Sequence, residues 1–344
     1  MPLSGDFDYI QAKAHGLRSK VYELERLDEL CGLRTLSQLW RRLYPEADAA
    51  DHQALERRLL ADQVAALEAI FAQVPRNLAA LAAWMMRRYQ VENLKVLLRG
   101  WKAREPAERV APFLAPLRGE LALDAAAFLR AADLASWVLR VPEGALRAAA
   151  LAAAPEHAET GETFFVEAAL DAAYYTGLLG LAGRLPALHR RACEGLVRRE
   201  AALYSTLAIF RLKLNHALPR ERVRPFLAGG ALPRATVERL FDYPDFRDML
   251  RHVPRELLNP KDTAGIATIA DLERVLWEQL LQDANRRFYR SEGDMGLLVA
   301  FYTIKRVELA NLIRVIEGVR YGMTAEAIRR GLMQPRAESL TASM

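Results

Sequence analysis

Apolar residues recur at intervals of three and four along most of the chain, which is the spacing of one face of an α-helix. One such series consists of Leu60, Val64, Leu67, Phe71 and Val74. No segment shows the strict alternation of apolar and polar residues that is typical of a half-buried strand. The pattern therefore predicts an all-α fold.

Residues typical of helix ends support this prediction. Thr268 and Asp271 are three positions apart and predict a capping box, with aspartate in place of the usual glutamate. The alanine-rich run 148–154 consists of good helix formers. Prolines are expected between the helices and not inside them, because proline cannot donate a backbone hydrogen bond.

The chain also contains an internal repeat. The segment RVAPFL at residues 109–114 returns as RVRPFL at residues 222–227. Further segments match at a nearly constant offset: residues 94–99 with 206–211, residues 133–141 with 245–253, and, as a third copy of the helix, residues 307–314. The shared Pro-Phe-Leu element goes beyond the periodicity common to all amphipathic helices, so the sequence predicts three related units.

Each unit is too long for a two-helix solenoid repeat and is better interpreted as a small helical bundle. Seams between the bundles are expected in residues 142–163 and 254–268, where proline and glycine are frequent. The sequence thus predicts three domains, at residues 1–141, 142–254 and 255–344.

Composition and charge narrow the class of protein. Hydrophobic residues make up 52% of the 344 residues and charged residues 26%, as in soluble globular proteins. The net charge of +5 is spread through mixed segments such as residues 190–200, which argues against a nucleic-acid partner. The longest uncharged run, residues 172–183, is shorter than the roughly 20 residues of a membrane span. With no secretory signal at its start, the chain is expected to stay inside the cell.

No motif in the sequence indicates catalysis or cofactor binding. Walker A, HExxH, EF-hand and GxSxG patterns are absent. The GxxGxxG run at residues 177–183 follows no strand and predicts close helix packing. The histidines are dispersed, and Cys31 and Cys193 stand alone, so no metal site is expected. The sequence therefore predicts a non-enzymatic protein with no cofactor and no small-molecule substrate.

Polar residues interrupt the apolar stripe of the repeated helix. Glu308 and Asn311 share one face of the third copy, and Gln90 and Asn93 hold the same relative positions in the first. A buried amide or carboxylate needs hydrogen-bond partners, so these residues could pin the helix to a neighbouring loop. The alternative is direct contact with a partner protein.

The middle copy differs, because Ala202 and Ser205 occupy the matching positions and are expected to close the stripe mainly by packing. Basic residues follow the asparagines along the first and third copies of the helix. The candidate structural or partner-binding residues are Gln90, Asn93, Lys95, Arg99, Glu308, Asn311 and Arg314.

The repeated helix at residues 89–99 and 302–318 resembles the Asn-Leu-Lys/Arg helix of the C-type subunit of archaeal and bacterial V/A-type rotary ATPases, which corresponds to the d-type subunit of the eukaryotic V-ATPase. The opening helix adds to the resemblance through Asp8, Tyr9, Ala12, Ala14, Arg18 and Ser19. The resemblance covers essentially the whole chain. The middle copy departs from the pattern with Ala202 and Ser205.

The resemblance implies three similar helical domains arranged as a funnel or V-shaped socket. Such a protein would sit on the proteolipid rotor ring, at the cytoplasmic face of the membrane, and would receive the central-stalk subunits (D/F type). Its function would be to couple ATP-driven rotation to transport of protons or sodium ions. Stiffness and broad interfaces serve that function better than a reactive group does.

Two other classes of function remain open at this point. Helical repeats also occur in adaptor or scaffold proteins unrelated to rotary ATPases. An all-α enzyme with carboxylates in a pocket is a third possibility, but the sequence has no DDxxD-type cluster.

Overall fold

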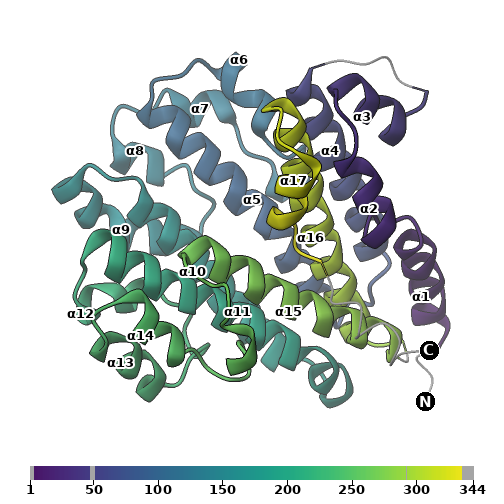
Figure 1. Ribbon diagram of the computed structural model, residues 1–344. Coiled ribbons are helices and arrows are strands. Elements are labelled where there is room, and N and C mark those ends of the chain that lie inside the picture. Colours follow the sequence, from purple (N-terminus) through teal and green to yellow (C-terminus); the bar gives the residue numbers. More distant parts are fainter. Residues whose placement is uncertain (1–3, 47–50, 292, 335–344) are drawn as a thin grey trace. The chain divides into compact units, whose positions relative to one another are not determined.

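The computed structural model describes residues 4–46, 51–291 and 293–334, and every regular element in these ranges is helical (Figure 1). The prediction of an all-α fold is confirmed. The longest helix, α11 (Ala187–His216), has 30 residues. Within the described ranges, none of the helices is both long enough and apolar enough to cross a membrane.

The chain divides into two compact units. The first comprises Met1–Ala79 and Arg274–Met344, and the second Ala80–Glu273. The first unit therefore joins the two ends of the chain. The domain boundaries predicted from the repeat, after residues 141 and 254, both fall within the second unit and stay a prediction.

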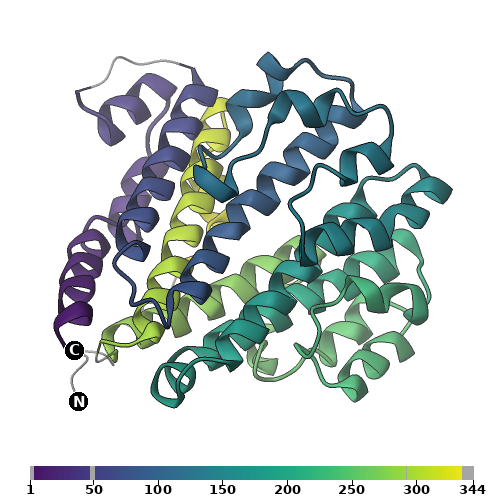
Figure 2. The ribbon, with the colours of Figure 1, turned by 180° about the vertical axis from the view of Figure 1, so that it is seen from behind.

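In the first unit the central helix is α16 (Met295–Arg320), which runs beside α4 (His52–Phe71) in both ribbon views (Figure 2). The other helices packed against α16 are α1 (Ser4–Arg18), α2 (Leu24–Cys31), α3 (Leu36–Leu43) and α17 (Ala325–Gly331). The helix α15 (Ile269–Tyr289) enters this unit from the second one. The apolar residues that α16 contributes to the core include Leu312, Val315, Ile316 and Val319.

In the second unit the long helices are α5 (Ala79–Lys102), α9 (Ala145–Thr160), α10 (Phe164–Gly183) and α11. Helix α10 packs against both α9 and α11. The shorter elements are α6 (Ala107–Val110), η1 (Ala111–Phe113), η2 (Gly119–Leu121), α7 (Ala125–Leu129), α8 (Leu134–Val138), α12 (Arg220–Val223), η3 (Arg224–Phe226), α13 (Arg234–Asp242), α14 (Phe246–Arg251) and η4 (Pro260–Asp262).

The glycine run of α10 supports close packing at one position only. A Cβ atom at Gly177 would clash with the ring of Trp84 from α5, whereas Gly180 and Gly183 have no atom within 4 Å of that position. Trp84 is fixed in place because its Nε1 donates a hydrogen bond of 2.9 Å to the carbonyl oxygen of Tyr174. The prediction of close helix packing is thus confirmed for Gly177 and is wrong for the other two glycines.

The expected capping box is present at the start of α15. The amide of Asp271 donates to Oγ1 of Thr268 at 3.1 Å, and the amide of Thr268 donates to Oδ2 of Asp271 at 3.0 Å. The expectation that prolines lie outside helices is wrong at Pro155, which is inside α9. Its ring removes the hydrogen bond to the carbonyl of Leu151, but the surrounding alanines and the packing on α10 keep the segment helical. The predicted seam at residues 142–163 is therefore mostly helix.

The repeat is visible in the backbone as a helix, a left-handed turn and a short helix. The left-handed residues after α5, α11 and α16 are Arg104 (φ 56°), Ala217 (φ 52°) and Gly322 (φ 66°). In each copy the amide of the next residue donates back to a carbonyl in the last turn of the helix, as in the Schellman motif. These bonds join Glu105 to Gly100 (2.9 Å), Leu218 to Leu212 (3.1 Å) and Met323 to Gly318 (2.8 Å).

The first and third copies also share a close approach between the long helix and the short one. A Cβ at Gly100 would lie 2.7 Å from the side chain of Val110, and a Cβ at Gly318 would lie 2.5 Å from that of Ile328. The second copy has Leu212 in place of the glycine. The three segments therefore have the same local fold, which supports the interpretation as three copies.

Candidate functional site

Asn93 joins α5 to the extended segment that follows η1. Its Nδ2 donates to the carbonyl oxygen of Ala115 at 2.9 Å, and its Oδ1 accepts from the amide of the same residue at 2.7 Å. Asn93 and Ala115 are both buried. The side-chain amide thus satisfies a donor and an acceptor of the backbone that would otherwise be buried without partners.

Asn311 makes the same pair of bonds in the third copy. Its Nδ2 donates to the carbonyl oxygen of Met333 at 2.7 Å, and its Oδ1 accepts from the Met333 amide at 2.9 Å. In both copies the partner lies 22 residues after the asparagine. The residue before each partner is leucine, Leu114 in the first copy and Leu332 in the third.

The middle copy keeps one of these bonds. Oγ of the buried Ser205 accepts from the amide of Ala228 at 3.1 Å, and Ala228 again follows a leucine. The expectation that this copy closes mainly by packing is therefore wrong at Ser205, because the shorter hydroxyl still reaches the backbone. Three polar side chains at equivalent positions fasten three equivalent loops.

Gln90 fastens a second loop to α5. It is fully buried, and its Nε2 donates to the carbonyl oxygens of Glu120 and Leu121 at 3.3 and 3.1 Å. Its Oε1 accepts from Nη1 of Arg87 at 3.1 Å. Gln90 and Asn93 thus hold both ends of the segment between η1 and η2.

Glu308 has a similar role in the first unit. Its Oε1 accepts from the amide of Tyr22 at 2.7 Å, and its Oε2 is paired with Lys305. Tyr22 lies in the connection between α1 and α2, so the carboxylate holds this connection against α16. Nearby, the buried guanidinium of Arg18 binds Glu23 and the side-chain oxygen of Asn285.

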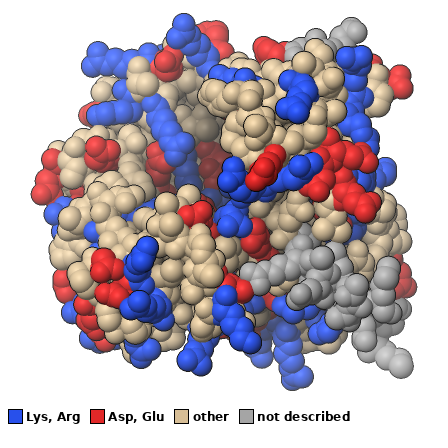
Figure 3. Space-filling view, in the orientation of Figure 1, with Lys and Arg blue, Asp and Glu red and all other residues tan. Residues whose placement is uncertain are grey.

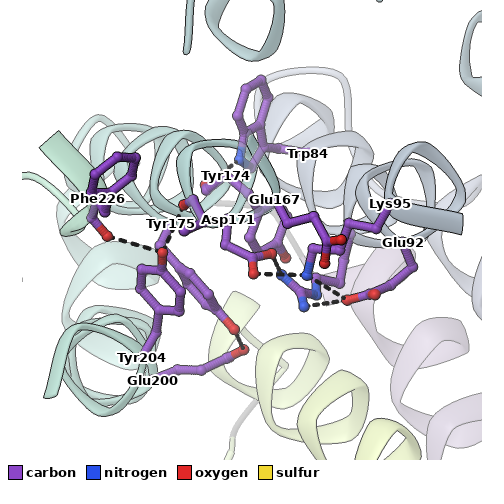
Figure 4. A network of polar contacts seen from close by, with 12 residues as sticks. Trp84, Glu92, Lys95, Glu167, Asp171, Tyr174, Tyr175, Glu200, Tyr204 and Phe226 are labelled. Atoms are coloured by element: carbon purple, nitrogen blue, oxygen red, sulfur yellow. Dashed lines mark hydrogen bonds and ion pairs between the residues drawn. The ribbon is translucent and has the colours of Figure 1, made fainter. Parts of the chain in front are cut away.

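Lys95 and Arg99 are paired with two carboxylates on α10, Asp171 and Glu167, and Figure 4 shows Lys95 beside these carboxylates. Nζ of Lys95 lies 2.7 Å from Oδ2 of Asp171, and Nε of Arg99 donates to Oε1 of Glu167 at 2.9 Å. The second oxygen of Asp171 accepts from Arg88 at 2.7 Å. The hydrogen bond from Arg99 to Glu167 raises the pKa of this arginine above its usual value.

Glu167 and Asp171, the acidic residues of this network, were not identified from the sequence, although their spacing could have indicated them. Glu167 and Asp171 are the only charged residues of α10 and lie one turn apart. Lys95 and Arg99 have the same spacing on α5. Complementary pairs with equal spacing on two helices can align face to face, so the pattern could have predicted this contact.

A half-buried tyrosine connects the second copy of the repeat to the same helix. The hydroxyl of Tyr204 on α11 lies 2.8 Å from the carbonyl oxygen of Ala168 and 3.0 Å from that of Phe226 (Figure 4). Burial raises the pKa of this hydroxyl well above its usual value. Tyr204 therefore stays protonated and links α10, α11 and η3.

A pair of carboxyl groups lies between α4 and α16 in the first unit. Glu56 shares a hydrogen bond with Glu317, and its Oε1 is buried without a hydrogen-bond partner. Glu317 is also paired with Arg320 at 3.2 Å. Burial and the bond to Glu317 raise the pKa of Glu56 to about 7.

The last candidate residue lies on the surface. Arg314 is exposed on α16. In the described residues, no group of three or more His, Cys, Asp and Glu side chains is placed to hold a metal ion. Cys31 and Cys193 are buried and free, and burial raises the pKa of Cys31 to about 11. On the face shown in Figure 3, positive and negative side chains are interspersed.

Comparisons with known proteins identify one family. The family described as ATP synthase (C/AC39) subunit matches residues 10–331. The C subunit of an A-type ATP synthase from Methanosarcina barkeri is 23% identical over 293 residues, which are 84% of this chain and 78% of that protein. An uncharacterized protein of Treponema pallidum is 28% identical over 229 residues, which are 62% of this chain and 60% of that protein.

Proposed function

The chain belongs to the family of ATP synthase (C/AC39) subunits of V/A-type ATPases, and we propose that it is the rotor coupling subunit of such a complex. In this role it connects the central-stalk subunits (D/F type) to the proteolipid ring without catalysing a reaction. It is attached peripherally, at the cytoplasmic face of the membrane, through that ring. The family match over nearly the whole chain carries the proposal and excludes an adaptor unrelated to rotary ATPases.

The fastened loops support a mechanical role. Transmission of torque requires that neighbouring segments do not slide or open under load. Each long repeat helix is tied to the segment that follows it by a buried side chain, namely Asn93, Ser205 or Asn311. Buried polar contacts of this kind have specific geometry and open only at a free-energy cost, because no water replaces the lost bond.

The charged contact between α5 and α10 supports the same role. Asp171 is bound by Lys95 and Arg88 at once, and Glu167 is bound by Arg99. The two ion-pair sites are one helical turn apart, so rotation of one helix against the other would break both. We propose that Gln90, Asn93, Lys95 and Arg99 hold α5 against neighbouring segments of the same chain.

The proposal includes the architecture inferred from the repeat. Three related domains, at residues 1–141, 142–254 and 255–344, form a funnel or V-shaped socket that receives the stalk. The three equivalent helix, turn and short-helix segments support this division. In this role the transported ion, H⁺ or Na⁺, would be selected by the membrane subunits.

The test uses sealed membrane vesicles that carry the complete complex. Removal of this protein should abolish ATP-driven ion accumulation, while ATP hydrolysis by the catalytic head continues. Addition of the purified chain should restore accumulation. Proton and sodium gradients are both measured, so that the result does not depend on the ion. Full pumping after verified removal of the protein would show that the coupling role is wrong.

A further inference from the structure

The first and second copies of the repeat present the same two side chains on the same backbone. Arg109 and Phe113 of the first copy correspond to Arg222 and Phe226 of the second. In both copies the arginine lies in a four-residue helix after a proline, and the phenylalanine ends the following 3-10 turn. The valine between the short helix and the 3-10 turn has φ −86° and ψ −38° in the first copy (Val110) and φ −80° and ψ −31° in the second (Val223).

In the second copy both side chains are bound by the α9 and α10 helices. Nε of Arg222 donates to Glu156 at 3.2 Å, and its Nη2 donates to Glu159 at 2.9 Å. The ring of Phe226 lies 5.7 Å from that of Phe165 and is only 2% exposed. Phe226 is therefore covered by an aromatic ring of the same chain, and the half-buried Arg222 is bound by two of its acidic side chains.

In the first copy the equivalent pair is open to solvent. Phe113 is 48% exposed, and the side chain of Arg109 is 76% exposed. The ion pair of Arg109 is a 3.5 Å contact with Glu105, four residues earlier in its own segment. The third copy has Ala327 and Gly331 at these positions and lacks both groups. Only the first copy thus offers the arginine and the phenylalanine together on the surface.

We propose that Arg109 and Phe113 form a docking site for a segment of a partner protein in which a helix with acidic side chains one turn apart is followed, after a turn, by an aromatic residue, as in α9 and α10 of this chain. The second copy shows the chemistry that fits this pair. Between residues 102 and 118 most of the exposed charged residues are basic, which also favours an acidic partner. Besides Arg109, the exposed basic residues are Lys102, Arg104 and Arg118, and the exposed acidic residue is Glu108. The proposal rests on the comparison of two copies in one chain and does not depend on the proposed coupling role.

A peptide of this chain itself is a suitable probe. Residues 152–168 contain the acidic pair and the aromatic residues that cover the second copy. A fluorescently labelled peptide with this sequence is titrated with the full-length protein, and binding is followed by fluorescence anisotropy. The Arg109→Gln and Phe113→Ala variants should each bind about fivefold more weakly or worse, because each removes one of the two contacts. Binding to the native protein should weaken with added salt.

Matched controls separate this site from general surface effects. The side chain of Arg234 is also 76% exposed and is also paired within its own helix, with Glu238. Leu151 is 48% exposed, as Phe113 is. The Arg234→Gln and Leu151→Ala variants should bind the peptide as the native protein does. A peptide with Lys in place of Glu156 and Glu159 should bind the Arg109→Glu variant better than it binds the native protein.

Three results would overturn the proposal. The first is equal peptide binding by the native protein and the Arg109→Gln and Phe113→Ala variants. The second is no binding to the native protein up to about 1 mM protein. The third is self-association of the native protein that Phe113→Ala abolishes in sedimentation experiments, since the occupant would then be a second copy of this chain. Because both side chains are exposed, all variants should retain the native melting temperature.

Discussion

Replacement of Asn93 with leucine should destabilise the second unit by a predictable amount. Leucine has a similar volume, but it cannot bond to the amide and the carbonyl of Ala115, which are buried. Each buried group left without a partner costs about 1 to 3 kcal/mol. Because the two groups belong to one residue and can shift together, we expect a total loss of about 2 to 4 kcal/mol in the free energy of unfolding.

The three copies allow an internal ranking of this effect. Asn311→Leu removes the same two bonds, to Met333, and should cost as much as Asn93→Leu. Ser205→Ala leaves only the amide of Ala228 without its partner and should cost about 1 to 2 kcal/mol. Asn215 is exposed on α11, so Asn215→Leu is the control and should be close to neutral.

The assay is chemical denaturation of the four purified variants, with a binding assay for stalk subunits carried out on the same samples. Loss of stability with retained binding at low temperature is the expected result, because both asparagines are buried and bonded to the backbone of their own chain. Unchanged stability with lost binding would instead assign them to a partner interface. If the two asparagine variants were as stable as the Asn215→Leu control, the fastening role would be refuted.

Three further predictions follow from single contacts. Gly177→Ala should lower stability by about 1 to 3 kcal/mol because its methyl group meets the ring of Trp84, whereas Gly180→Ala should be neutral or slightly stabilising in thermal melts. Asp171→Asn should cost about 2 kcal/mol, since it removes the shared counter-ion of two basic side chains, and added salt should reduce the difference from the native protein. The pKa of Glu56 is about 7 in the folded protein and near 4.5 in the unfolded chain, so folding favours the protonated carboxyl. The resulting contribution to the free energy of unfolding is fully present below pH 4.5 and is lost as the pH rises through 7. Melting curves from pH 4.5 to 8 should show this loss relative to Glu56→Gln, and parallel curves for the two proteins would contradict it.

Much of the fold could be predicted from the order of residues because helices depend on local spacing. The apolar periodicity, the Thr268 cap and the repeated helix each involve residues within one or two turns of each other. The positions of Asn93 and Asn311 could also be predicted, since a polar residue on an apolar stripe is visible without knowledge of its partner.

The partners themselves depend on the path of the chain. Asn311 binds Met333, yet the loop of the third copy lacks the Pro-Phe-Leu sequence that marks the other two, so local similarity could not identify it. Phe113 and Phe226 occupy closely similar local segments, but one is exposed and the other is covered by α10. The exposure of a side chain, its ion-pair partner and its hydrogen-bond partner depend on elements far away in sequence. Only the tertiary structure brings these elements together.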